Sequence, residues 1–102
     1  MMKKNLPTYC LDRIKNSFNS EDKLRMTLSA RRAINDLDYS DADVVAAIQS
    51  ITPADFHKSM PPLHEGYTAW QDVYRPHYKK VQLYMKFQIN ADGELIVSFK
   101  KK

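Results

Sequence analysis

Cysteine and glycine are scarce in this 102-residue sequence, which has one cysteine, Cys10, and two glycines, Gly66 and Gly93. A single cysteine excludes an internal disulfide and any zinc site built from several cysteines, and we expect Cys10 to be a small buried residue. The chain also lacks a glycine-rich phosphate loop and an HExxH motif. Its apolar runs fall short of the roughly 20 residues of a membrane helix, and its first residues do not resemble a signal peptide. We therefore expect one cytoplasmic domain over residues 1–102, with no metal ion, no other cofactor and no membrane contact.

Basic residues concentrate in the C-terminal part of the chain. The net charge at pH 7 is +4, from 16 lysines and arginines against 12 aspartates and glutamates. Residues 75–102 carry seven basic and two acidic side chains, a local charge of +5, whereas residues 1–74 carry nine and ten, a local charge of −1. A basic region on a nearly neutral body is typical of proteins that bind RNA, DNA or another phosphate-bearing partner. The charge alone is equally consistent with a solvated lysine surface that binds nothing specifically.

Helical patterns dominate the first half of the chain. Apolar residues recur at intervals of three and four, which predicts helices over about residues 11–18, 30–37 and 41–51. Ser29 is expected to be the N-cap of the second helix, and Ser40 with Asp43 forms the capping-box pattern of the third. Residues 24–28 alternate apolar and polar side chains, which predicts an extended segment between the first two helices.

Strand patterns replace the helical ones in the second half. Extended segments are expected over residues 57–60, 67–75, 81–89 and 95–100, the last two with clean alternation of apolar and polar side chains. Helices followed by strands indicate an α+β domain, in which helices pack on the apolar side of an antiparallel sheet.

A turn at residues 90–93 predicts how the last two strands pair. The sequence Asn-Ala-Asp-Gly is typical of a hairpin turn, because glycine adopts a positive φ freely. A three-residue loop at this place puts Tyr84 opposite Lys100 and Lys86 opposite Ser98, and it keeps all apolar side chains of both strands on one face. Tyr84, Lys86 and Lys100 are therefore expected to share the polar face of the sheet.

A set of cationic, phenolic and imidazole side chains falls on or beside the predicted strands, namely His57, Lys58, Gln71, Arg75, Tyr84 and Lys100. Such groups suit the cleavage of RNA without a metal ion. That reaction needs a proton acceptor for the 2′-hydroxyl, cations for the crowded phosphorane and a proton donor for the leaving 5′-oxygen. Each residue also has an ordinary structural interpretation: the lysines could be solvated charges, the tyrosine a packing residue and the arginine part of a surface ion pair.

Four segments closely resemble the MqsR toxin family in their order and spacing: DFHKSM at residues 55–60, WQDVYRP at 70–76, YMK at 84–86 and IVSFK at 96–100. The resemblance implies a fold similar to the RelE-like ribonucleases, with N-terminal helices packed on a C-terminal antiparallel sheet. It also implies a type II toxin that cleaves mRNA without a metal ion at short GC-containing, GCU-like sites and so inhibits translation. An antitoxin similar to MqsA is the implied protein partner, and operator DNA would be contacted only through that antitoxin.

Matched motif by motif, the family's functional residues fall on positions already singled out by their chemistry. The resemblance implies functional roles for Lys58, Gln71, Arg75, Tyr84 and Lys100. We expect further RNA contacts from Met60, Lys79, Lys80, Lys86 and Lys101. A well-known family member has tyrosine at the position of His57 and histidine near the position of Thr8. Since histidine titrates near neutral pH, His57 is a further candidate for proton transfer.

Two other classes of function remain open from the sequence. A non-catalytic basic regulator of transcription would bind nucleic acid in a salt-sensitive way and break no strand. A scaffold that only binds a protein partner would need none of the polar strand residues. A ribonuclease of the implied kind would leave a 2′,3′-cyclic phosphate if the 2′-hydroxyl is the nucleophile.

Overall fold

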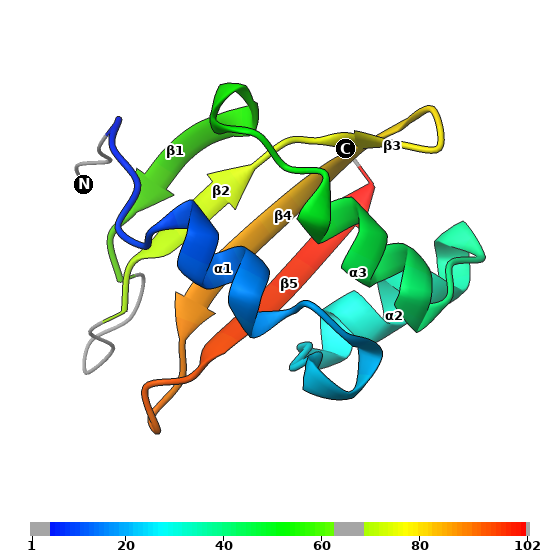
Figure 1. The fold of residues 1–102 in the computed structure, drawn as a ribbon, viewed down its shortest axis with the longest axis horizontal. Coiled ribbons are helices and arrows are strands. Elements are labelled where there is room, and N and C mark those ends of the chain that lie inside the picture. The colour runs from blue at the N-terminus through cyan, green and yellow to red at the C-terminus, as the bar shows by residue number, and fades with distance from the viewer. Residues whose placement is uncertain (1–4, 63–68, 102) are drawn as a thin grey trace.

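The computed structural model describes residues 5–62 and 69–101, and in these residues three helices precede five strands (Figure 1). The helices are α1 (Leu11–Ser17), α2 (Leu28–Leu37) and α3 (Asp41–Gln49). The strands are β1 (Phe56–Met60), β2 (Gln71–Tyr74), β3 (His77–Tyr78), β4 (Val81–Ile89) and β5 (Leu95–Lys101). Single 3₁₀ turns, η1 (Glu21–Lys23) and η2 (Pro53–Asp55), precede α2 and β1. The order of elements confirms the α+β class, and no described helix is long and apolar enough to cross a membrane.

β4 is the central strand of one antiparallel sheet. β5 pairs with its Leu83–Ile89 stretch, β2 and β3 pair with it along the other edge, and β1 lies outside β2. Tyr84 lies opposite Lys100 and Lys86 opposite Ser98, so the predicted register is confirmed.

The turn between β4 and β5 is the one that the sequence predicts. The backbone N–H of Asn90 donates to the carbonyl of Glu94 over 2.8 Å, and Gly93 has a φ of +78°. The side-chain oxygen of Asn90 accepts from the N–H groups of Asp92 and Glu94. Asn90 therefore closes the loop through hydrogen bonds of both its backbone and its side chain. These bonds fix the register in which β4 and β5 pair.

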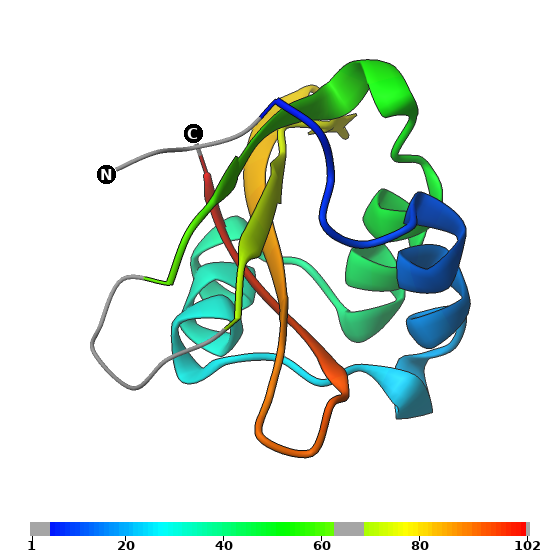
Figure 2. The ribbon, with the colours of Figure 1, turned by 90° about the vertical axis from the view of Figure 1, so that its left-hand side faces the viewer.

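α1 and α3 cover one face of the sheet (Figures 1 and 2). Beneath them lie the buried apolar side chains Ile14, Phe18, Val44, Ala47, Ile48, Leu83, Met85, Phe87, Leu95, Val97 and Phe99. The rings of Phe18 and Phe87 meet across this interface with centroids 6.0 Å apart. The odd-numbered apolar residues of the last two strands thus form the core, as their alternation predicts.

α2 stands beside β5, on the side of that strand away from β4. The residues just before it extend the sheet: the N–H of Thr27 donates to the carbonyl of Val97 over 3.1 Å, and the N–H of Val97 donates to Arg25 over 2.9 Å. Ala30 and Ile34 of α2 are buried and belong to the core. In Figure 2, α2, drawn in cyan, lies on the opposite side of the strands from α1 and α3. α2 therefore forms a wall beside the sheet face that the other helices leave uncovered.

Two local predictions are wrong. α2 begins at Leu28 and its N-cap is Thr27, whose hydroxyl accepts from the N–H of Ala30 over 3.2 Å, so Ser29 already lies in the first turn. An N-cap side chain accepts a hydrogen bond from the N–H group three residues later. The backbone bond of Thr27 to Val97 of β5 fixes Thr27 in the position from which its hydroxyl can do this. Cys10 is exposed, because it is the N-cap residue that precedes the apolar stripe of α1.

The sequence pattern missed the short β3–β4 hairpin. Lys79 and Lys80 form its two-residue turn with φ values of +50° and +65°. Such turns usually use Asn-Gly, and a pair of lysines carries no comparable signal. The strand expected over 67–75 is β2, which starts at Gln71, while residues 63–68 lie outside the described part of the chain.

Candidate active site

The sheet face opposite α1 and α3 carries polar side chains from four strands, and we call it the polar face. Its members alternate with core residues and are Lys58 and Met60 of β1, Gln71 and Val73 of β2, Tyr84, Lys86 and Gln88 of β4, and Ser98 and Lys100 of β5. Pairing aligns Lys58, Val73, Lys86 and Ser98 in one row across the sheet. Neighbouring strands lie about 4.8 Å apart, so the backbones of Lys58 and Lys86 are separated by about 10 Å, with buried Val73 between them.

A β-bulge in β1 brings His57 onto this face. Phe56 lies opposite Tyr74 and Lys58 opposite Val73, so His57 is the extra residue of the strand. The ring of Phe56 packs on Tyr74, on the core side, with centroids 5.4 Å apart. His57 instead meets the ring of Tyr84, so two consecutive residues of β1 belong to the polar face.

Side chains from three strands meet at Tyr84. The His57 ring lies edge-on to it at a centroid distance of 6.4 Å, and the ammonium nitrogen of Lys100 lies 5.4 Å from the centre of the phenol ring. Tyr74 differs from Tyr84 because it faces the core, and burial raises the pKa of Tyr74 to about 12. Tyr84 is thus the tyrosine that this face offers for chemistry.

Gln71 carries an unsatisfied acceptor. Its amide nitrogen donates to the side-chain oxygen of Gln88 on β4, and its own Oε1 is buried and accepts no hydrogen bond from any described residue. Buried polar atoms are nearly always bonded, so an atom of this kind needs an explanation. A bound molecule with an N–H or O–H group would provide the missing donor.

Arg75 is held through its backbone just after the end of β2. Its N–H donates to the carbonyl of Asp55 over 2.8 Å, which ties η2 to the sheet. The side chain is half-buried, and within residues 5–62 and 69–101 its guanidinium forms no hydrogen bond or ion pair. The structure therefore fixes the backbone of Arg75, while none of the described residues pairs with its charge.

A groove of about 390 Å³ runs between α2 and the β4–β5 hairpin. The strands supply Tyr84, Lys86, Ser98, Phe99 and Lys100, and the helix supplies Ser29, Arg32, Ala33 and Asp36. The hydroxyls of Ser29 and Ser98 lie 3.2 Å apart across its floor. The sequence did not predict that α2 lines this groove. A helical pattern shows that Arg32 and Asp36 share a face of the helix, but it does not show which strand that face contacts.

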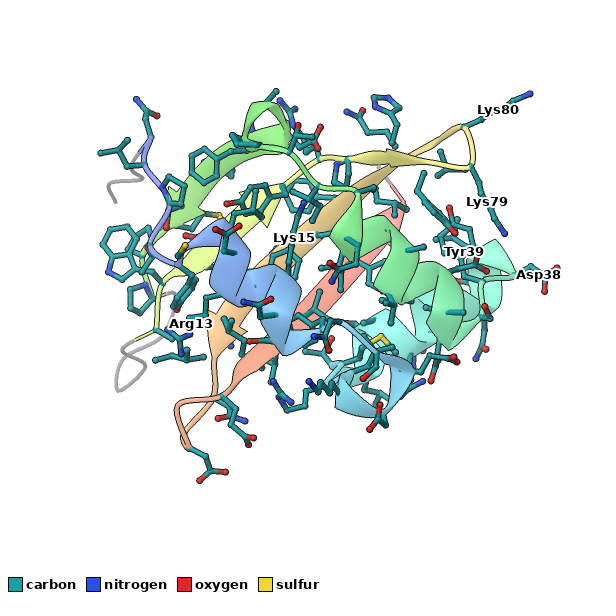
Figure 3. All side chains as sticks on the ribbon, viewed as in Figure 1. Arg13, Lys15, Asp38, Tyr39, Lys79 and Lys80 are labelled. Atoms are coloured by element: carbon teal, nitrogen blue, oxygen red, sulfur yellow. The ribbon has the colours of Figure 1, made fainter. Side chains whose placement is uncertain are left out.

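Lys79 and Lys80 lie away from the polar face, at the tip of the β3–β4 hairpin. Figure 3 shows Lys80 pointing outward and Lys79 pointing toward the region of Tyr39. Lys79 pairs with Asp43 of α3 over 2.8 Å, and the Tyr78 hydroxyl donates to the same carboxylate oxygen over 2.9 Å. The Lys79 contact, with the N–H of Ser40 and the Tyr78 hydroxyl, holds the pKa of Asp43 well below its ordinary value. The charge of Lys79 is thus engaged on the helical side.

Lys101 is the last residue of β5, where it pairs with Leu83. It follows Lys100, the last residue of the strand that lines the groove.

The buried carboxylate of Asp72 anchors the N-terminal segment to the sheet. It accepts from the N–H of Thr8 over 2.9 Å, from the N–H of Tyr9 over 2.8 Å and from the hydroxyl of Ser59 over 2.7 Å. Tyr9 adds a bond from its hydroxyl to the carbonyl of Trp70 over 2.7 Å. Asp72 is fully buried on the sheet face opposite Lys58. Its role within the WQDVYRP segment is therefore structural.

Within the described residues, no three histidine, cysteine or carboxylate side chains gather in a group that could hold a metal ion. The polar face is built instead from lysines, amides, a phenol and an imidazole.

Two comparisons relate the chain to known proteins. Residues 6–101 match the family described as "Motility quorum-sensing regulator, toxin of MqsA". The chain is also 36% identical over 101 residues to the mRNA interferase toxin MqsR of Escherichia coli (strain K12), an alignment that covers 99% of this chain and 100% of the relative.

Proposed function

The chain belongs to the MqsR toxin family, and we propose that it is an mRNA interferase, a toxin that inhibits translation and growth by cutting mRNA. The relative of E. coli bears the name of that activity and aligns over its whole length. The observation that carries the proposal is the meeting of His57, Tyr84 and Lys100 from three strands on one rigid face. Lys58 and Lys86 flank this group in the neighbouring row.

The proposed reaction is a transesterification within the RNA. The 2′-oxygen attacks the adjacent phosphorus, the bond from phosphorus to the 5′-oxygen breaks, and a 2′,3′-cyclic phosphate and a 5′-hydroxyl result. One enzyme group takes the proton of the 2′-hydroxyl, and another gives a proton to the 5′-oxygen. No further reactant is needed, so we propose that the reaction proceeds without a metal ion.

The side chains of the polar face can fill these roles. Lys58, Lys100 and Arg75 would stabilise the negative charge that develops on the phosphorane, because fixed cations lower its free energy most when they need not reorganise. Tyr84 and His57 would carry the two protons. Gln71, with its buried unpaired oxygen, would accept a hydrogen bond from the RNA and orient it.

We further propose a short GC-containing, GCU-like cleavage site and an antitoxin similar to MqsA as the protein partner. The family description names the toxin of MqsA, which supports such a partner. Contact with operator DNA would then come only through the antitoxin. Met60 and Lys86 would guide the RNA along the polar face, Lys101 would add positive charge at the end of β5, and Lys79 and Lys80 would add at most long-range charge from the hairpin tip.

The decisive experiment incubates the purified protein with end-labelled RNA in the presence of EDTA. We expect cleavage, with a cyclic phosphate that acid treatment opens to a product of different mobility. Lys58→Ala and Lys100→Ala should each lower the rate by about 10²-fold or more, while the free energy of unfolding changes by only about 0.5 kcal/mol. Lys23→Ala, which removes an exposed lysine from η1, is the matched control and should cleave like the wild type.

The same experiment separates the enzyme from a non-catalytic regulator. Salt-sensitive binding with intact RNA after long incubation would favour the regulator and overturn the proposed activity. Cleavage that stops in EDTA and returns with a divalent cation would retain the nuclease but contradict the metal-free mechanism.

A further inference from the structure

The groove between α2 and the β4–β5 hairpin opens directly from the candidate active site. Tyr84, Lys86 and Lys100 belong both to the polar face and to the groove. Its volume of about 390 Å³ lies within the range of about 300–1,000 Å³ that is usual for small-molecule sites. An RNA strand held at Tyr84 would therefore enter the groove with the nucleotide next to the reacting phosphate.

Two charged residues of α2, Arg32 and Asp36, line this groove. Arg32 and Asp36 are four positions apart, which places them on one side of the helix. Both are exposed, and in the part of the chain that the structure describes neither forms a hydrogen bond or a salt bridge. The adjacent Arg31, by contrast, is paired with Asp41 over 2.9 Å. The charged side chains of Arg32 and Asp36 are thus available to a ligand.

The opposite charges of Arg32 and Asp36 suit different parts of a nucleotide. A guanidinium binds phosphate oxygens in a two-pronged geometry. A carboxylate repels phosphate, so the only favourable partners that RNA offers to Asp36 are the N–H groups of bases and the hydroxyls of ribose. Unpaired RNA bases are commonly recognised through their Watson–Crick edges.

The geometry of a carboxylate favours one base. Guanine presents two adjacent donors on its Watson–Crick edge, the N1–H and the 2-amino group, which match the two oxygens of a carboxylate. Adenine and cytosine present one amino group beside an acceptor, and uracil presents one N–H between two carbonyl oxygens. Those acceptors would face the negative charge of Asp36 and weaken binding.

We propose that α2 selects the nucleotide beside the cleaved bond, with Asp36 hydrogen-bonded to a guanine base and Arg32 bound to the neighbouring phosphate. This inference rests on the proposed ribonuclease function and deepens it, because it assigns base selection to a helix outside the sheet. The strands provide the groups that take part in the reaction, and α2 determines which RNA sequence is cut.

The test compares the cleavage sites of the wild type, Asp36→Asn and Arg32→Gln in a pool of random-sequence RNA, read by sequencing the cut ends. Asp36→Asn keeps the size of the side chain but replaces one acceptor by a donor. We expect the wild type to favour guanine at one position near the cut, and Asp36→Asn to reduce that preference about tenfold, as loss of a two-bond base contact implies. Arg32→Gln should slow cleavage at all sites alike and leave the base frequencies unchanged.

Asp38→Asn is the matched control, since it removes an exposed carboxylate at the end of the same helix, where asparagine tolerates the φ of +57°. It should reproduce the wild-type base frequencies. Identical frequencies in wild type and Asp36→Asn at every position would overturn the inference while leaving the ribonuclease function intact. A wild-type protein that cuts no RNA would instead overturn the proposed function, and the inference with it.

Discussion

The imidazole of His57 lies edge-on to the phenol ring of Tyr84, with centroids 6.4 Å apart and ring planes inclined by 68°. The bulge in β1 creates this contact, because regular alternation would place His57 and Lys58 on opposite faces of the sheet. Two groups able to move protons therefore stand together beside the ammonium group of Lys100. An acid and a base at this separation can act at the two sides of one phosphate.

Replacing either ring should reveal which one transfers protons. We expect His57→Tyr to keep cleaving RNA but to lose the pH dependence that imidazoles produce between about pH 6 and 7. Tyr84→Phe removes only a hydroxyl and should lower kcat by about 10²–10⁴-fold, the usual loss for a general acid or base. Profiles of kcat against pH for the three proteins provide the measurement. The same inflection in wild type and His57→Tyr would exclude His57 from proton transfer, and an unchanged kcat in Tyr84→Phe would exclude Tyr84.

The lysines should divide into RNA contacts and structural partners. Lys86→Gln should weaken RNA binding at every sequence and reduce the slope of log affinity against log salt by about one. Lys79→Gln should leave that slope unchanged, because Lys79 is paired with Asp43 on the helical side. Titrations at about 50 to 200 mM salt with an RNA analogue that lacks 2′-hydroxyls measure binding without cleavage. Equal slopes in wild type and Lys86→Gln would contradict the RNA contact of Lys86.

Local signals explain why the β4–β5 hairpin could be predicted. The Asn90–Gly93 turn carries its own chemistry, and once the turn is known, alternation places Tyr84 opposite Lys100. The β3–β4 turn could not be found in the same way, because Lys79 and Lys80 take their positive φ values without the residues that usually mark them. Here the contacts of the hairpin tip with α3 override the local preference.

Long-range packing decides the parts of the site that the sequence did not reveal. The bulge at His57 depends on how β1 pairs with β2, which no pattern within β1 contains. The groove depends on α2 standing at the edge of β5, a position set by the backbone bonds that Arg25 and Thr27 make with Val97. The sequence could therefore identify Tyr84 and Lys100 as neighbours, but not Arg32 or Asp36 as the wall beside them.

The buried carboxylate of Asp72 should matter for stability. Asp72→Ala would leave the N–H groups of Thr8 and Tyr9 and the hydroxyl of Ser59 without their acceptor, so we expect a loss of about 2–4 kcal/mol in the free energy of unfolding. Ser59→Ala removes one donor and leaves the carboxylate two others, and it should cost only about 1 kcal/mol. Urea unfolding measures both. A loss for Asp72→Ala no larger than that for Ser59→Ala would show that the N-terminal segment is not anchored here.

Protonation of Asp43 should loosen the β3–β4 hairpin from α3. The carboxylate is bonded to Lys79, to the N–H of Ser40 and to the hydroxyl of Tyr78, and these contacts hold the pKa of Asp43 well below its ordinary value. The folded protein then binds fewer protons at this site than the unfolded chain does. The stabilising contribution of the Asp43 carboxylate is complete above the ordinary aspartate pKa of about 3.9 and disappears as the pH falls below that value.

For Lys79 the sign is opposite, because Asp43 raises the pKa of Lys79. The stabilising contribution of Lys79 is lost only as the pH rises above about 10.4.

Asp43→Asn tests this acid dependence. We expect the variant to be less stable than the wild type at pH 7, and its free energy of unfolding to fall less steeply between about pH 5 and 2. The two stability curves should converge at acid pH, because the wild-type carboxyl is then neutral as well. Asp41→Asn changes a neighbouring carboxylate whose partner is the exposed Arg31, and it should keep the acid slope of the wild type. Urea unfolding at a series of pH values gives the measurement, and parallel curves for wild type and Asp43→Asn would show that this carboxylate does not fasten the hairpin to the helix.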